Sequence, residues 1–377
     1  MISFRSTEEE LAFVEVAKNL AKEKIRPQAR ICERNQKLNE EIVQEVQELG
    51  FLSLELSEDW DGLELPLISQ VQILQGLCYG DLDVVQGLPG AGDAASFIRF
   101  LNQRLDTYKT DIVDELQTVS YLDLSEDWGT NIEVKKEMNH YILNGMSQPV
   151  KLAAQADYVL IAVMDSNGEP ILFWLDSSVH PWHVEEGDYR LGLLTSGIAR
   201  FTFDHVKIST DAILAQGNTA EKIIQDGRTR VRILQAAREV GLMEAALDYA
   251  TEYTASRKAF GQEIAKFQGV SFRIAKMAIE TRIVNHLVWE AALQADQEHP
   301  EAEGLSLRAL HRAHKSLRYV TDSAVQLLGG HGYIQEFPVE KWMRDAQAQV
   351  TLYGRERQCL KKRGEQIIAG NREEVMA

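Results

Sequence analysis

The hydrophobic residues of this 377-residue chain change their spacing twice, and that change limits the folds open to it. Up to about residue 118 they recur at helical spacing, as with Ile42, Val43 and Val46 ahead of Gly50, a typical helix-ending residue. From Ala220 almost to the end of the chain the helical spacing returns. The chain is therefore predicted to be helical in its first and last parts, with another kind of structure between them.

The middle stretch carries the signals of β structure. Strand-like runs at 158–163, 171–175 and 201–203 are separated by Gly, Asp, Ser and Pro, and Asn144-Gly145 predicts a hairpin turn. Several such short strands favour a small β barrel or sandwich. We therefore expect an α+β fold. Its predicted parts are an N-terminal helical domain (1–118), a middle β domain (119–219) and a C-terminal helical domain (220–377).

Charge and cysteine content narrow the class of protein. A net charge of −17 argues against nucleic acid or an anionic membrane as the main partner. Cys32, Cys78 and Cys359 are far apart and match no disulfide spacing, which favours a reducing compartment. No apolar run reaches membrane-spanning length, and no histidine or carboxylate cluster has metal-site spacing. We expect a cytoplasmic protein without a metal.

A glycine-rich turn, Gly329-Gly330-His331-Gly332, interrupts the last helical stretch. Such a turn either caps a core helix or offers backbone N–H groups and space to a phosphate or a planar ring. The residues alone leave both explanations open.

Several stretches together resemble the acyl-CoA dehydrogenase family, in the family's order and at about its separations. They are SEDWDGLEL (57–65), FDHVKI (203–208), SRKAFGQEIAKFQ (256–268), QLLGGHGY (326–333) and MRD (343–345). The resemblance runs nearly end to end. It implies a helical N-terminal domain, a middle β barrel, a C-terminal four-helix bundle, and a homotetramer or homodimer with FAD at a subunit interface.

The resemblance also implies which residues bind FAD. Arg257 and Phe260 match residues that contact the FAD of the neighbouring subunit, and a guanidinium suits a pyrophosphate because it donates a planar fork of hydrogen bonds. Gln268 and Gln326 are expected either at the adenosine part or as partners of buried carbonyls. Gly329 and Gly330 match glycines that let the cofactor approach the backbone.

The region that should face the flavin ring departs from the family. Only Gly129 and Thr130 remain of a Thr-Glu-Pro turn leading to Gly-Ser-Asp. Pro149 stands where a stacking aromatic is expected and removes a backbone donor. Lys151 would bring an ammonium near the flavin, where it either stabilises a reduced anionic ring or is merely solvated.

The expected catalytic base is replaced as well. Removing the α-proton of an acyl thioester calls for a carboxylate, but Tyr353 occupies the family's glutamate position. An alternative base position holds Val231, followed by Arg232, which is expected to bind substrate. A tyrosine with an ordinary pKa of about 10 is a poor base. Glu356 is the candidate substitute, unless it is a solvent-facing helix charge.

Three hypotheses follow from these matches and departures. The first is a FAD-dependent oxidoreductase that acts on the CH–CH group of an acyl thioester, uses an atypical base and passes electrons to a separate acceptor. The second is a flavin-dependent oxidase or monooxygenase on the same fold. The third is a catalytically inactive binding or partner subunit, because a fold alone does not fix chemistry.

Overall fold

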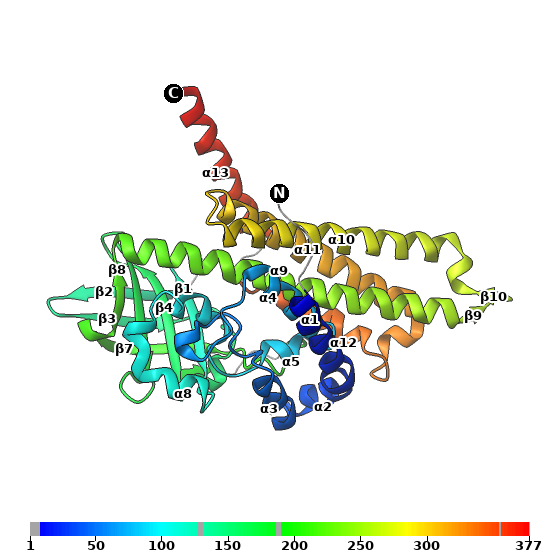
Figure 1. The fold of residues 1–377 in the computed structure, drawn as a ribbon, viewed down its shortest axis with the longest axis horizontal. Helices are drawn as coiled ribbons and strands as arrows, with labels where there is room; N and C mark the ends of the chain where they lie inside the picture. Colours follow the sequence, from blue (N-terminus) through cyan, green and yellow to red (C-terminus); the bar gives the residue numbers. More distant parts are fainter. Residues whose placement is uncertain (1–7, 127–130, 186–189, 354–355, 377) are drawn as a thin grey trace.

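The computed structural model describes residues 8–126, 131–185, 190–353 and 356–376. A long helical bundle forms one side of the molecule and a β domain the other, with the N-terminal helices packed below their junction (Figure 1). The predicted order of helical, β and helical parts is confirmed. Gly129 and Thr130 lie outside the described ranges.

Short helices with local caps make up the N-terminal part. Asn39 caps α3 by accepting a hydrogen bond from the Glu41 N–H, and Asp81 caps α5 by accepting from the Val84 N–H. The elements are α1 (Glu8–Leu20), η1 (Ala21–Ile25), α2 (Arg26–Asn35), α3 (Glu40–Glu48), η2 (Glu58–Trp60), α4 (Leu67–Cys78), α5 (Leu82–Gln86), η3 (Gly92–Ala94), α6 (Ala95–Ile98), α7 (Asn102–Leu105), η4 (Asp106–Tyr108) and α8 (Lys109–Val113).

The β domain contains two four-stranded sheets that face each other. One has the order β1-β4-β5-β8, with β1 parallel to β4, and the other is antiparallel with the order β2-β3-β7-β6. The elements are β1 (Val119–Leu124), β2 (Asn131–Glu137), β3 (His140–Met146), η5 (Ala153–Gln155), β4 (Tyr158–Met164), β5 (Pro170–Asp176), β6 (His183–Glu185), β7 (Arg200–Ser209), η6 (Thr210–Ala212) and β8 (Ile213–Gln216).

The first sheet is covered on both faces. Phe173 packs with Phe201 and Phe203 of the second sheet, while Trp174 on the opposite face joins a core that includes helical residues such as Phe97. Burial on both sides explains why β4 is a continuous apolar run and does not alternate.

The hairpin predicted at Asn144-Gly145 is wrong, because both residues lie inside β3. The pairing of β3 with β7 shifts register between Leu143 and Gly145. Gly145 has a φ of 122°, and a Cβ there would lie 1.9 Å from the Asn131 carbonyl oxygen. Gly145 therefore allows a β-bulge in β3 and the close approach of β2, and it does not form a turn.

Helix α9 spans 39 residues and runs from the β domain to the far end of the bundle. Helices α10 and α11 pack along it, and α4 covers α9 and α10. The elements are α9 (Asn218–Ser256), β9 (Lys258–Ala259), β10 (Gln262–Glu263), η7 (Ile264–Lys266), α10 (Gln268–Asp296), α11 (Ala302–Leu328), η8 (Gly329–Tyr333), α12 (Val339–Gln349) and α13 (Glu356–Met376).

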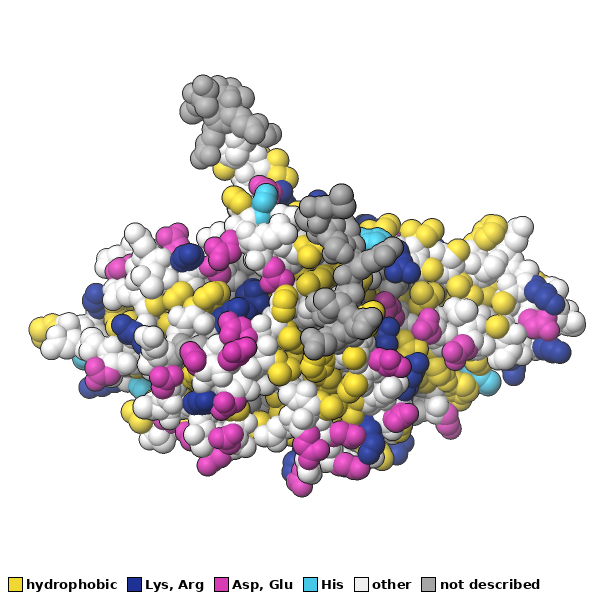
Figure 2. Space-filling model, viewed as in Figure 1, with side chains coloured by type: hydrophobic (Ala, Val, Ile, Leu, Met, Phe, Trp, Pro, Cys, Tyr) yellow, Lys and Arg dark blue, Asp and Glu magenta, His cyan; other side chains and the backbone are white. Residues whose placement is uncertain are grey.

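Two parts of the bundle present apolar surface. Hydrophobic side chains are exposed along the bundle (Figure 2), among them Phe272, Ile279 and Ile283 of α10. Helix α13 packs against α11 and then extends away from the body, with Ile367 and Ile368 exposed. None of the helices in the described ranges has the length and apolar character needed to cross a membrane.

Candidate functional site

The predicted cofactor residues of the C-terminal part gather at the far end of the bundle. Arg257, Phe260 and Gln268 lie where α9 passes through the β9–β10 hairpin into α10. Gln326, Gly329 and Gly330 lie at the end of α11, which finishes at the same end.

These residues form an open surface. Phe260 is 95% exposed, and a Cβ placed on Gly329 or Gly330 would meet no atom within 4 Å. Gln268 and Gln326 are also exposed, so they do not serve buried carbonyls. A guanidinium donates a planar fork of hydrogen bonds that suits a phosphate, and the open glycines leave space beside the backbone.

Lys151 lies far from that surface, in the interior where the three domains meet. The segment that carries it is fixed by hydrogen bonds between the Val150 N–H and the Ala199 oxygen (2.8 Å) and between the Ser120 hydroxyl and the Lys151 oxygen (2.8 Å). Its side chain turns inward and the residue is only 5% exposed. The expectation that the Lys151 ammonium is merely solvated is therefore wrong.

The Lys151 ammonium belongs to a buried group of charges. It lies 2.6 Å from the Asp93 carboxylate, which also pairs with Arg238 of α9 at 2.9 Å. Half-buried Tyr353 adjoins the group: its hydroxyl interacts with Asp93, and its ring centre lies 5.9 Å from Lys151 Nζ. Asp93 and Arg238 are site residues that the sequence analysis missed.

Burial sets the protonation of this group. It lowers the pKa of Lys151 to about 8, although the Asp93 charge opposes the change. Burial and the Asp93 charge raise the pKa of Tyr353 well above its ordinary value. Burial would also raise the pKa of Asp93, but the charges of Lys151 and Arg238 outweigh it and lower that pKa. The Tyr353 phenol is thus held protonated.

Glutamines from separate helices extend the polar group. Lys151 donates to the Gln86 oxygen at 3.0 Å, and the Gln86 amide donates to Gln235 and Gln349, each at 2.8 Å. Gln86 ends α5 and Gln349 ends α12, so the position of Lys151 depends on how those two helices are held.

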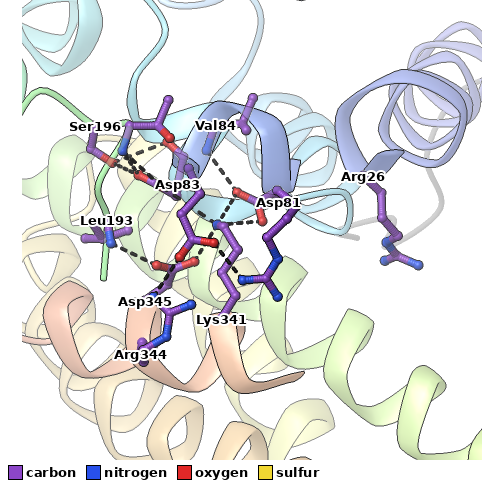
Figure 3. Close-up of polar contacts among 12 residues, drawn as sticks. Arg26, Asp81, Asp83, Val84, Leu193, Ser196, Lys341, Arg344 and Asp345 are labelled. Atoms are coloured by element: carbon purple, nitrogen blue, oxygen red, sulfur yellow. Dashed lines mark hydrogen bonds and ion pairs between the residues drawn. The ribbon is translucent and has the colours of Figure 1, made fainter. Parts of the chain in front are cut away.

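A second buried cluster, the Lys341 cluster, holds α5 and α12 together (Figure 3). Lys341 Nζ of α12 lies 2.8 Å from Asp81, 2.7 Å from Asp345 and 3.7 Å from Asp83. The β domain joins through Leu193, Thr195 and Ser196. The Leu193 N–H donates to Asp345 at 2.8 Å, and the Thr195 N–H and Ser196 hydroxyl donate to Asp83.

The three carboxylates of this cluster lie close enough to one another to hold a metal ion, and they form the group of this kind among the described residues. Lys341 already supplies a positive charge among them, so we assign the cluster to structure. Burial and the charges of Asp83 and Asp81 raise the pKa of Asp345 to about 7, against the opposing charge of Lys341.

Arg232 and Glu356 are engaged elsewhere. Arg232 is buried and pairs with Glu126 at 2.8 Å and Glu303 at 3.6 Å. Glu356 pairs with Arg318 of α11. Neither side chain belongs to the group around Lys151.

Two small spaces lie beside Lys151. An outer depression of about 40 Å³ is lined by Tyr121, Gln148, Pro149 and Tyr353, and an inner cavity of about 70 Å³ lies between α4, α5 and α9. Lys151 lines both. A larger cleft of about 350 Å³ lies between α1, α4, α9 and α10, but no predicted site residue lines it.

The chain matches two family models, described as the N-terminal domain (residues 7–100) and the C-terminal domain (residues 222–361) of acyl-CoA dehydrogenase. It is 25% identical over 361 residues to the mitochondrial short/branched chain specific acyl-CoA dehydrogenase of Bos taurus. That match covers 90% of this chain and 81% of the relative.

Solved structures agree in fold. Butyryl-CoA dehydrogenase from Megasphaera elsdenii superposes with a TM-score of 0.86 at 24% identity, covering 97% of this chain and 100% of that one. PigA with FAD and proline superposes with a TM-score of 0.87 at 18% identity, covering 97% and 99%.

The chain belongs to the acyl-CoA dehydrogenase family, a family of FAD-binding flavoprotein oxidoreductases. Its fold class is that of the family: helical N- and C-terminal parts with a middle β region.

Proposed function

We propose that the protein is a FAD-dependent oxidoreductase acting on the CH–CH group of an acyl thioester, with an atypical proton acceptor. One observation carries the proposal: buried Lys151 and Asp93 and half-buried Tyr353 form an ionisable group at the position expected to face the flavin. Burying such charges is costly and their pKa values are strongly shifted, which is characteristic of active sites.

Two copies of the chain are needed to assemble this site. Arg238, beside Lys151, is on α9, and Arg257 directly follows the end of α9, so about 28 Å of chain separates them at about 1.5 Å per helical residue. The exposed bundle-end residues therefore bind the FAD of a neighbouring copy in a homodimer or homotetramer. The small size of the outer depression fits a pocket that the second copy completes.

The roles divide as follows. Arg257, Phe260, Gln268, Gln326, Gly329 and Gly330 hold the adenosine-diphosphate part of the cofactor. Lys151 lies at the ring, with Gly129 and Thr130 assigned there by the resemblance alone. FAD, when bound, supplies hydride acceptance. Tyr353 keeps its proton and orients the site through Asp93.

Proton removal falls to another group of the chain. Glu356 remains a candidate only if it leaves Arg318. Arg232 reaches substrate only if it leaves Glu126 and Glu303.

Absorption spectra test the proposal directly. The purified protein should be yellow with bound FAD, and an acyl-CoA should bleach the flavin without oxygen. Tyr353→Phe should keep the flavin, because the adenosine side is untouched. If this variant bleaches at the wild-type rate, Tyr353 has no catalytic role.

A non-catalytic partner subunit is the second candidate, favoured by the small outer depression. Protein that is colourless and refuses added FAD would support it. If acyl-CoA does not bleach the bound flavin, but the protein oxidises another substrate and consumes oxygen, the oxidase or monooxygenase hypothesis is supported.

A further inference from the structure

The inner cavity behind Lys151 has walls of two kinds. Leu74, Leu77, Leu88 and Leu234 make it apolar on most sides. Gln70 and Arg238 bring polar atoms to the same space. A volume of about 70 Å³ has room for a few water molecules, and it is far below the ~300 Å³ at which ordinary small-molecule sites begin.

Two polar atoms of buried residues that line the cavity lack partners. Arg238 is 8% exposed, and its Nε has no hydrogen-bond acceptor among the described residues. Gln70 is also buried, and no described residue donates to its Oε1, an acceptor that a water would satisfy; the unpaired donor available to an anion is Arg238 Nε. Unpaired groups of this kind are rare in folded proteins and indicate a missing water, ion or ligand.

Charge indicates which kind of ligand fits. Around the cavity, Lys151 and Arg238 share the single carboxylate of Asp93, which leaves one positive charge in excess. The other carboxylate, Glu55, is already paired with Arg99 at 2.6 Å and Arg230 at 2.6 Å. A buried excess charge is unfavourable, and one further carboxylate would balance it.

We propose that the inner cavity binds the terminal carboxylate of a short dicarboxylic acyl group, held by Arg238 and Lys151. This proposal rests on the proposed function, because the thioester end would lie in the outer depression beside Tyr353. The acyl group then runs past Lys151, the residue that lines both spaces.

Size limits the length of the acyl group. The inner cavity, at about 70 Å³, is small, so we expect only about one or two methylene groups between the carboxylate and the reacting carbons. A fatty acyl chain would place apolar carbons against Lys151, Arg238 and Gln86, with no hydrogen-bond acceptor to offer them. Burial is the main cause of the lowered pKa of Lys151, and the nearby Arg238 charge lowers it further.

Matched thioesters test the proposal on the unmodified protein. Dissociation constants for glutaryl-CoA, pentanoyl-CoA and octanoyl-CoA are measured by calorimetry on the purified flavoprotein. The first two have the same number of carbons and differ by the carboxylate. We expect glutaryl-CoA to bind at least about tenfold more tightly than pentanoyl-CoA, because a charge-assisted contact replaces an apolar one. Octanoyl-CoA should bind most weakly.

Variants identify the group responsible. Arg238→Met should abolish the preference for glutaryl-CoA, while Asp93 keeps its partner Lys151. Arg238→Lys should restore part of the preference. Arg308→Met is the control, since it removes an arginine that pairs with Glu290 on the bundle surface, and it should behave as wild type.

The outcomes separate the two proposals. Equal or tighter binding of pentanoyl-CoA means that waters fill the cavity, and it overturns the carboxylate site while leaving the proposed function intact. A preference for glutaryl-CoA that survives Arg238→Met overturns the assignment of Arg238. Failure of every thioester to bind overturns both proposals together.

Discussion

Lys151 is the residue on which the candidate site depends most. Its neighbours in the sequence, Val150 and Leu152, are apolar, and only the fold supplies its charged partners. Asp93 precedes Lys151 in the sequence and Arg238 follows it, and all three residues meet at the junction of the three domains. A lysine with a pKa of about 8 carries its charge at neutral pH and loses it under mildly alkaline conditions.

The affinity for a dicarboxylic thioester should therefore depend on pH. Below about pH 8 Lys151 is protonated and attracts the carboxylate, and above that pH the attraction is lost. We expect the dissociation constant of glutaryl-CoA to rise roughly tenfold between pH 7 and 9.5, measured by calorimetry. Arg238 stays charged throughout, and Asp93 and Tyr353 do not titrate in this window because one pKa is lowered and the other raised.

Pentanoyl-CoA is the reference ligand for this titration, and its affinity should stay constant. A pH dependence shared by both thioesters would assign the effect to the CoA part or to the protein as a whole, and not to Lys151.

At the scale of single elements, β3 shows where sequence patterns stop being informative. Asn-Gly is the commonest signal of a two-residue hairpin, yet here the chain continues straight through it. The glycine is required by the Asn131 carbonyl of the neighbouring strand, 1.9 Å from a Cβ at position 145. The turn preference of Asn-Gly is a local property, so it does not reveal that a strand about a dozen residues away leaves no space for a Cβ at position 145.

Gly145→Ala should destabilise the protein by roughly 2 kcal/mol, because the backbone would be strained and β2 displaced. The free energy of unfolding in urea measures the loss. Gly168→Ala is the matched control, since Gly168 also has a positive φ (78°) but has no atom within 4 Å of a Cβ. An equal loss in both variants would show that φ alone is responsible and the close approach is not.

The helical elements were predictable because their determinants are local. The helical spacing of hydrophobic residues predicts the buried face of α9. Gly50 follows the end of α3, and Gly329 caps the end of α11. The exposed position of Arg257 and Phe260 also follows from a turn at a helix end. The charge partners of Lys151 were not predictable, because Asp93 lies in a short η3 whose place beside α9 is fixed by long-range packing.

At the scale of the whole molecule, the Lys341 cluster joins the three domains behind the site. It contains three carboxylates and one ammonium, so the cluster has an excess of negative charge. The raised pKa of Asp345, about 7, relieves part of it by keeping a proton. The folded chain then binds more protons than the unfolded chain between about pH 4 and 7, and stability falls as pH rises through that range.

Asp345→Asn should remove this dependence, because the amide carries no charge at any pH and still accepts from the Leu193 N–H. Relative to wild type, the variant should gain stability from pH 5 to pH 7 by up to about 1.4 kcal/mol per pH unit. Melting temperatures across this range measure the change. The exposed Asp322→Asn serves as control and should follow the wild-type curve, and a parallel curve for Asp345→Asn would contradict the raised pKa.

A site assembled from two copies predicts complementation between defective chains. Arg257→Glu removes the adenosine-side contact and Lys151→Met removes the ring-side ammonium, so neither variant alone should be bleached by acyl-CoA. A dimer with one chain of each kind contains one intact site out of two. Random pairing in an equal mixture makes about half of the dimers mixed, so the mixture should recover about a quarter of the wild-type bleaching. Mixtures that stay inactive, although mass spectrometry shows mixed dimers, would place both residues in the same chain's site.

The ion pair between Lys151 and Asp93 has a kinetic consequence. Any ligand that enters the inner cavity must draw the ammonium partly away from a carboxylate 2.6 Å from it, and the pair re-forms once the ligand leaves. Entry and escape are then both resisted by the same electrostatic barrier, so long residence times accompany only modest affinity. Product departure, a step that limits many enzymes, would be slow in an enzyme built this way.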